Sequence, residues 1–297
     1  MVFYRKYYRK FNSAFLFLSL SIAGLFLLNC VAAASGENIN DFELLQKRLV
    51  EDGFNPERIA AVYGKPGVKF ETKRVGAYFV YRESKLNYDL FTQDHRIQNA
   101  RTYMEAHAGA LVDAEKGYGV QKEVITAILL VETQLGTSLG RTATLNILSS
   151  MAALSEPKVK TVLWKSIAGK KRYSWEKFEK KAKTKSRWAY KELKAFLDYT
   201  AREEIDPTTV YGSFAGAVGI SQFMPSNILS LGIDGNRDGR LDLFDHDDAI
   251  ASVANYLKHH GWHPGIDRNR AYKVVLRYNY SKYYANIILK IADILKG

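Results

Sequence analysis

The sequence predicts a mainly α-helical protein. Apolar side chains recur every three or four residues through most of the chain, which is the pattern of helices with one buried face. Strand-like alternation is scarce, and only residues 69–74 favour a short strand as a small β element. With 297 residues, 47% of them hydrophobic, the chain is long enough to bury a sizeable core.

Six helices are expected. The first covers about 42–53, because Leu45 and Leu49 lie one turn apart and Gly53 ends the pattern. The second covers 96–118 and is followed by a glycine, which commonly ends a helix. The other four are expected at about 121–135, 188–204, 247–260 and 284–295.

A secretory signal peptide is expected at residues 1–34. Basic residues come first, an apolar run at 14–28 follows, and small residues lead to cleavage near Ala34. The apolar run is short for a stable membrane span. Two alternatives are lipid attachment at Cys30, since Leu-Leu-Asn-Cys loosely resembles a lipoprotein box, and an uncleaved anchor. All three interpretations imply export to the periplasm or cell envelope. Lipid attachment and an uncleaved anchor also imply membrane association through the N-terminus.

Charge favours an anionic partner. The formal net charge is +12, and export makes the cell wall and anionic lipid head groups better candidates than nucleic acid. Lysines are concentrated at about 156–190, with three tryptophans, Trp164, Trp175 and Trp188, among them. This composition favours a solvated helical hairpin, and the alternative is a basic aromatic flap that contacts anionic wall polymer. Cys30 is the only cysteine, so the mature protein has no disulfide.

One acidic residue lies on the apolar helix expected at 121–135. Ile128 and Leu129 precede Glu132 by four and three residues, and therefore share its side of the helix. Partial desolvation raises the pKa of a carboxyl group and keeps it protonated near neutral pH, as a general acid requires. The alternative is a glutamate at a frayed helix end that points into water.

A glycine-rich turn at 212–225 is the second candidate element. Its glycines and small residues allow the backbone to approach a ligand closely, and Gln222 offers both donors and an acceptor to an amino sugar. Pro225 can open a helix, because its missing N–H costs little in the first turn. The alternative is a tight turn with a purely structural role.

These two segments resemble the lytic murein transglycosylase B family. The resemblance is carried by Val-Glu-Thr around Glu132 and by Gly-Ser-Phe-Ala-Gly-Ala followed by Gln-Phe-Met-Pro, and it extends over nearly all of residues 35–297. It implies one catalytic domain with a lysozyme-like α-helical core, in which Glu132 is the catalytic acid and Ser213 and Gln222 line the sugar-binding cleft.

The C-terminal part of the resemblance is looser. Tyr278, Asn279 and Tyr284 resemble the family's substrate-contacting tyrosines and asparagine. Two features depart from the family: the Lys-rich insertion at about 156–190 is long, and the segment at 155–157 lacks the expected aromatic residue and paired arginines. These departures affect the expected sugar-binding geometry and not the chemistry.

A calcium-binding loop like that of an EF-hand is expected at 234–245. Oxygen-bearing side chains stand at loop positions one, three, five, nine and twelve, with glycine at position six. Asp245 replaces the usual glutamate at position twelve, and related family members carry a calcium loop at this place. The alternative is a polar turn without metal. The expected ligands are Asp234, Asn236, Asp238, Arg240 through its backbone carbonyl, Asp242 and Asp245.

The expected function follows from the family and from the single convincing acid. The family cleaves the bond between N-acetylmuramic acid and N-acetylglucosamine in peptidoglycan without water and leaves 1,6-anhydromuramic acid ends. A lysozyme-like muramidase and a non-catalytic wall-binding protein of the same fold are the alternatives. No organic cofactor is implied, the calcium is expected to be structural, and the protein is expected to be a monomer that does not bind nucleic acid.

Overall fold

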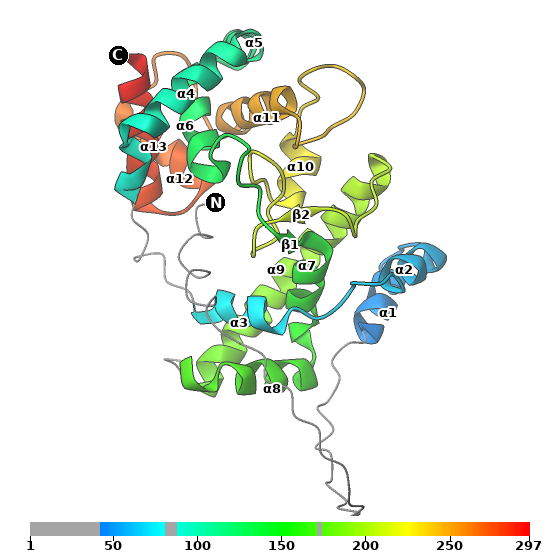
Figure 1. Cartoon of the computed structure of the whole chain (residues 1–297). Coiled ribbons are helices and arrows are strands. Elements are labelled where there is room, and N and C mark those ends of the chain that lie inside the picture. The colour runs from blue at the N-terminus through cyan, green and yellow to red at the C-terminus, as the bar shows by residue number, and fades with distance from the viewer. Residues whose placement is uncertain (1–41, 81–87, 171–173) are drawn as a thin grey trace, which may run out of the picture.

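A computed structural model describes residues 42–80, 88–170 and 174–297 (Figure 1). The expected signal peptide, including Cys30, lies outside the described residues. Among the helices that are described, none is both long and apolar enough to cross a membrane.

Helices dominate the described part of the chain, as predicted. A single antiparallel sheet of two very short strands, β1 (Thr142–Ala143) and β2 (Tyr211–Gly212), is found there. Three 3-10 helices are η2 (Tyr88–Thr92), η3 (Ala153–Ser155) and η4 (Ala168–Lys170). The α-helices are α1 (Glu43–Glu51), α2 (Pro56–Tyr63), α3 (Thr72–Val80), α4 (Asp94–Ala106), α5 (Ala108–Tyr118), α6 (Lys122–Thr133), α7 (Thr144–Ala152), α8 (Pro157–Ser166), α9 (Trp175–Arg202), α10 (Pro225–Leu231), α11 (His246–His259), α12 (Arg268–Tyr278) and α13 (Lys282–Lys296).

Helix α6 lies at the centre of one group of helices. Helices α4, α5, α11 and α13 all pack against it (Figure 1). Every residue from Val124 to Thr133 is therefore buried, rather than only the stripe that the sequence predicted. A second group contains α7 packed on α9, with α3 and α8 nearby, and the small sheet lies between the two groups (Figure 1).

The helix expected at 96–118 is two helices, α4 and α5. The chain leaves helical geometry at His107 (φ −112°, ψ 29°). Its imidazole ring lies 4.3 Å from the ring of Tyr103 and 4.5 Å from that of His246, between ring centroids. The break allows α5 to turn and pack along α11, so a long-range contact overrides the continuous helical pattern.

The strand expected at 69–74 does not form. Residues 69–71 are irregular, and α3 begins at Thr72. Two backbone N–H groups of this segment donate to side chains of α7: Lys69 to Asn146 Oδ1 at 3.4 Å and Glu71 to Ser150 Oγ at 2.8 Å. The extended backbone is thus satisfied by a helix and not by a neighbouring strand.

Helix α9 begins much earlier than predicted, at Trp175 instead of residue 188. Ser174 caps it by accepting a hydrogen bond from the N–H of Lys177. Together with α8 it forms the predicted helical hairpin, but its aromatic residues are not simply solvated. The rings of Trp164 and Trp175 pack around the fully buried Phe178, with centroids 5.1 and 5.6 Å from it.

Candidate active site

Glu132 lies in the last turn of α6, and the end of this helix is tied to the glycine-rich turn. The Thr133 hydroxyl donates to the carbonyl oxygen of Ile220 at 2.9 Å and accepts from the Gly136 N–H at 3.0 Å. Gln134, Leu135 and Gly136 all have positive φ, which turns the chain sharply away from the helix. The segment after α6 thus holds Glu132 beside the turn at 212–225.

The side chain of Glu132 is 7% exposed and lies in a mostly apolar environment. Burial raises the pKa of its carboxyl group, because the charged form loses water. Tyr278 and Tyr284 lie close enough to interact electrostatically with this carboxyl group. The Tyr284 hydroxyl lowers the pKa of Glu132 and so opposes part of the effect of burial. Burial therefore shifts Glu132 toward the protonated form, which a general acid requires.

The two tyrosines belong to the end of α12 and the start of α13. Their rings are stacked nearly parallel, 9° apart in plane and 6.4 Å between centroids. The Tyr278 hydroxyl donates to the Ser221 carbonyl oxygen at 2.6 Å, which joins this pair to the glycine-rich turn. Three segments distant in sequence therefore meet around Glu132. Asn279 ends α12 and is half-buried.

The two predicted residues of the turn also stabilise its backbone. Ser213 Oγ accepts from the N–H groups of Ala215 at 3.2 Å and Ala217 at 2.9 Å. The Gln222 amide donates to the carbonyl oxygens of Gly219 at 2.8 Å and Leu139 at 3.3 Å. Both side chains are more than nine-tenths buried, so any sugar contact would use their remaining hydrogen-bonding capacity.

Glycine is required in this turn for close packing. Gly216 has φ +91°, and a Cβ atom there would lie 2.6 Å from the Leu148 side chain. Glycine at position 216 is therefore needed to seat the turn on α7.

Sequence reasoning missed two residues of the site, Ser221 and Thr133. Ser221 is completely buried, its carbonyl oxygen accepts from Tyr278, and its hydroxyl has no hydrogen-bond partner among the described residues. The signal for both was only their position next to Gln222 and Glu132.

The loop at 234–245 is shaped by its own side chains. Three of its side chains accept hydrogen bonds from backbone N–H groups of the loop, and the shortest bond of each is 2.9 Å long. They are Asp234, Asn236 and Asp238. Asp242 is exposed, and its Oδ1 atom accepts a hydrogen bond from the Phe244 N–H at 2.9 Å. No group of three His, Cys, Asp or Glu side chains in the described residues is arranged to hold a metal ion.

Asp245, expected as the last ligand, caps α11 by accepting from the N–H groups of Asp247 and Asp248. Asp248, which the sequence analysis did not consider, is 1% exposed and accepts from Gly235 at 2.8 Å and from Asp242 at 2.7 Å. In the described residues this loop is therefore held by hydrogen bonds from its own side chains and from Asp248, and the calcium site stays a prediction.

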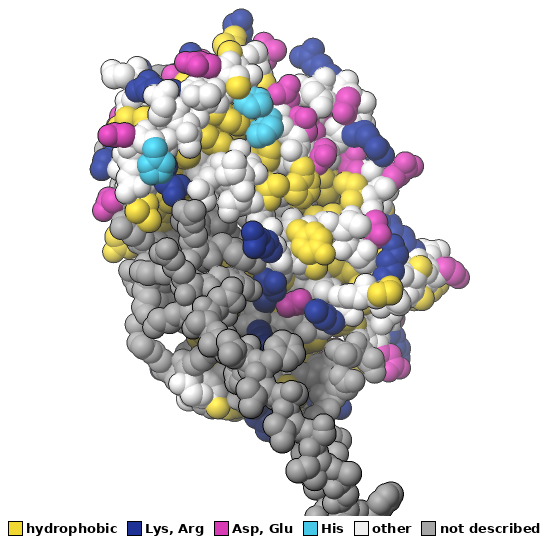
Figure 2. Space-filling model, viewed as in Figure 1, with side chains coloured by type: hydrophobic (Ala, Val, Ile, Leu, Met, Phe, Trp, Pro, Cys, Tyr) yellow, Lys and Arg dark blue, Asp and Glu magenta, His cyan; other side chains and the backbone are white. Residues whose placement is uncertain are grey.

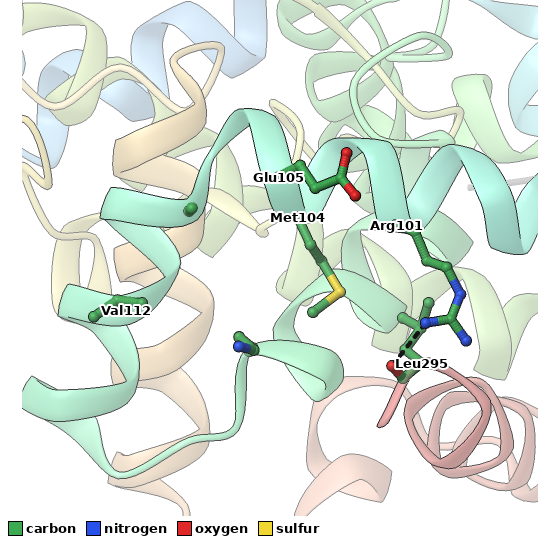
Figure 3. Close-up of a pocket in the computed structure, with 7 residues that line it drawn as sticks. Arg101, Met104, Glu105, Val112 and Leu295 are labelled. Atoms are coloured by element: carbon green, nitrogen blue, oxygen red, sulfur yellow. Dashed lines mark hydrogen bonds between the residues drawn. The ribbon is translucent and has the colours of Figure 1, made fainter. Parts of the chain in front are cut away.

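A cavity of about 320 Å³ lies away from this site (Figure 3). Arg101, Met104 and Lys122 are among its lining residues, and Lys122 begins α6 whereas Glu132 is near its end. Arg101 donates to the Leu295 carbonyl oxygen at 3.3 Å at the end of α13. This cavity is separate from the site around Glu132.

A family model described as the transglycosylase SLT domain matches residues 38–270. The chain belongs to this family. A curated relative, membrane-bound lytic murein transglycosylase B of Escherichia coli, is 34% identical over 190 residues. The match covers 64% of this SLT-domain chain and 44% of the relative, so the chain matches less than half of the relative's length.

Two solved structures share the fold. One is Escherichia coli lytic transglycosylase Slt35 in complex with calcium, with a TM-score of 0.66 and 22% identity, covering 88% of this chain and 93% of that one. The other is SltB3 from Pseudomonas aeruginosa in complex with NAG-anhNAM-pentapeptide, with a TM-score of 0.67 and 19% identity, covering 88% and 80%. The lysozyme-like, mainly α fold expected for this SLT-domain chain is confirmed.

Proposed function

We propose that this SLT-domain chain is a lytic transglycosylase that cleaves peptidoglycan glycan strands. The observation that carries the proposal is the burial of Glu132, which raises its pKa, beside two stacked tyrosines at the glycine-rich turn. A relative named for the same activity and a solved neighbour bound to a peptidoglycan fragment support it.

Glu132 would act first as acid and then as base. Its proton passes to the oxygen between N-acetylmuramic acid and N-acetylglucosamine, and the bond from that oxygen to the muramic C1 breaks. The muramic acetamido group assists at C1. The Glu132 carboxylate then takes the proton of the C6 hydroxyl, whose oxygen bonds to C1, displaces the assisting acetamido oxygen and closes the 1,6-anhydro ring. The second step is intramolecular and consumes no water.

The surrounding residues would hold the sugar and the acid in place. We assign substrate contacts to Ser213, Gln222, Tyr278, Asn279 and Tyr284. The stacked tyrosines support this role because they lie beside Glu132 and offer polar hydroxyls within an apolar wall. Glycosidases that use water generally need a second carboxyl group in the site, and among the described residues Glu132 is the single convincing acid.

A lysozyme-like muramidase is the rival function, and product mass separates the two. Muropeptides released from purified sacculi should carry anhydro ends, which are lighter than reducing ends by one water. Reducing ends as the main product would establish the muramidase. Absence of any release, with retained binding to sacculi, would instead establish a non-catalytic wall-binding protein.

We also propose a structural calcium ion in the loop at 234–245. Asp234, Asn236 and Asp238 are already drawn together, since the first two both accept from the N–H of the third. Their oxygens, with the Arg240 carbonyl and the carboxylates of Asp242 and Asp245, are the donor type that calcium prefers. The ion would stabilise the loop and take no part in bond cleavage.

We also propose that the protein is exported and monomeric. Residues 1–34 would act as the signal peptide and residues 35–297 as the catalytic domain of a monomeric envelope protein. The membrane-bound relative supports a place in the cell envelope. Mass spectrometry of the protein from membrane and soluble fractions distinguishes cleavage near Ala34 from lipid attachment at Cys30.

A further inference from the structure

The chain's net positive charge is concentrated in one segment. Residues 157–188 contain twelve Lys and Arg against two Glu, a surplus of ten in a chain whose net charge is +12. In the structure this segment covers α8 and the first half of α9, and one of its two glutamates, Glu179, pairs with Lys160 at 2.8 Å. A surplus of this size in so few residues attracts anions strongly.

Two of these lysines lie against aromatic rings. The Lys185 ammonium is 5.3 Å from the centroid of the Tyr78 ring and 4.9 Å from that of Trp188. The Lys181 ammonium is 6.0 Å from the Tyr78 ring and donates to the Phe79 carbonyl oxygen at 3.3 Å. We refer to Tyr78, Lys181, Lys185 and Trp188 as the aromatic–lysine site. All four side chains are half-buried.

The two ammonium groups are held near the same ring although they repel each other. Lys181 and Lys185 are one helical turn apart, and burial together with the charge of Lys185 lowers the pKa of Lys181. An anion placed beside both would remove this repulsion. The arrangement is therefore suited to an acidic ligand.

The aromatic–lysine site adjoins the glycine-rich turn. The Tyr78 ring lies 5.9 Å from the ring of Phe214, which follows Ser213 in that turn. A polymer lying along the turn would thus reach the two lysines. The face shown in Figure 2 carries Lys and Arg side chains close to exposed apolar side chains.

We infer that the aromatic–lysine site binds the carboxylate groups of the peptide stems on a glycan strand lying in the adjoining cleft. This inference rests on the proposed function, because it assumes that the turn holds a glycan. Peptide carboxylates are favoured over lipid phosphates because the site is next to that turn and because peptide stems project from the same strand. The site would therefore make the protein prefer peptide-bearing glycan to bare glycan.

The test compares two double variants of the full chain that lose the same charge. Lys181→Gln/Lys185→Gln removes the aromatic–lysine site, and Lys180→Gln/Lys183→Gln removes two exposed lysines of the same helix. Initial rates are measured on intact sacculi and on glycan strands stripped of peptides by an amidase. The first variant should lose about tenfold in kcat/KM on intact sacculi, the effect of one charge-assisted contact, and change little on stripped strands. The second should behave as wild type on both.

Binding is measured separately in a Glu132→Gln background, by sedimentation with the same two substrates, so that it does not depend on catalysis. Equal losses on both substrates, or equal losses in both double variants, would overturn the inference. So would selective loss of binding to phosphatidylglycerol vesicles, which would assign the site to lipid. The single variant Lys185→Gln should reproduce the selective loss if the double variant folds poorly. A wild type without activity on either substrate, but with selective binding, would refute the proposed function and retain this inference.

Discussion

Glu132 and the acidic loop at 234–245 both adjoin the glycine-rich turn, yet they use carboxyl groups in opposite ways. Ile220 in the turn is held from both sides: its carbonyl accepts from Thr133, and its N–H donates to Leu243 at 2.7 Å. On the α6 side, Glu132 is buried among apolar residues and tyrosine rings. On the loop side, the carboxylates of Asp234, Asp238 and Asp242 each accept a hydrogen bond from a backbone N–H group.

The comparison shows that surroundings, and not residue type, separate an acid from a structural group. A carboxylate bonded to several N–H groups holds the backbone in a fixed shape, whereas a buried one is raised in pKa and can deliver a proton. Asp248 combines the two cases: burial raises its pKa as it does that of Glu132, but hydrogen bonds from the N–H groups of Asp242 and Gly235 oppose this rise and anchor the loop. Substitutions at the two kinds of carboxyl group should therefore have different effects.

Replacing the buried acid should abolish activity. Glu132→Gln removes the proton donor while nearly preserving shape, and we expect the rate of muropeptide release to fall about a thousandfold. The matched control is Glu123→Gln in the first turn of the same helix, which should keep wild-type activity. Sacculi that the Glu132 variant still cleared at a normal rate would remove this residue from the proposed role.

Removing the loop anchor should reduce stability and affect catalysis only indirectly. Asp248→Ala leaves the N–H groups of Gly235 and Asp242 without their acceptor, and we expect a loss of about 3 kcal/mol in the free energy of unfolding. Urea unfolding followed by circular dichroism measures it. Asp247→Ala, at a half-buried neighbour, should cost much less, and equal losses in the two variants would contradict the anchoring role.

Calcium should stabilise the loop without changing the chemistry. At calcium concentrations well above its dissociation constant, we expect about 2 kcal/mol of added stability, seen as a rise in Tm of several degrees. The double variant Asp234→Asn/Asp238→Asn should lose this response. A Tm that does not change when a chelator removes calcium would count against the proposed ion.

The smallest expected effect is on stability: Glu132→Gln, which should abolish activity, should also raise the free energy of unfolding. Because burial raises the pKa of Glu132 above the ordinary 4.5, the folded state favours the protonated form and loses stability as pH rises through the raised pKa. Glu132→Gln should therefore be more stable than wild type by about 1 kcal/mol at pH 7, and the difference should shrink toward pH 4. A difference independent of pH would show that the carboxyl group is not responsible.

Much of the candidate site was predictable because its parts lie in short segments. The helix around Glu132 was identified from its apolar neighbours, and the glycine-rich turn from its small residues. Ser221 and Thr133 were missed, because their roles consist of contacts with residues far away in the chain. The same reason applies to the break at His107, whose ring contacts that of His246 from a distant part of the chain.

The sequence by itself determined the helical class, the apolar helix that ends in an acid, and the glycine-rich turn. These depend on side-chain periodicity and backbone freedom, which act over a few residues. Only the tertiary structure decided that Tyr278 and Tyr284 stack beside Glu132, and that Asp245 caps a helix while Asp248 anchors the loop. Such arrangements result from packing between distant segments, and local sequence patterns therefore do not predict them.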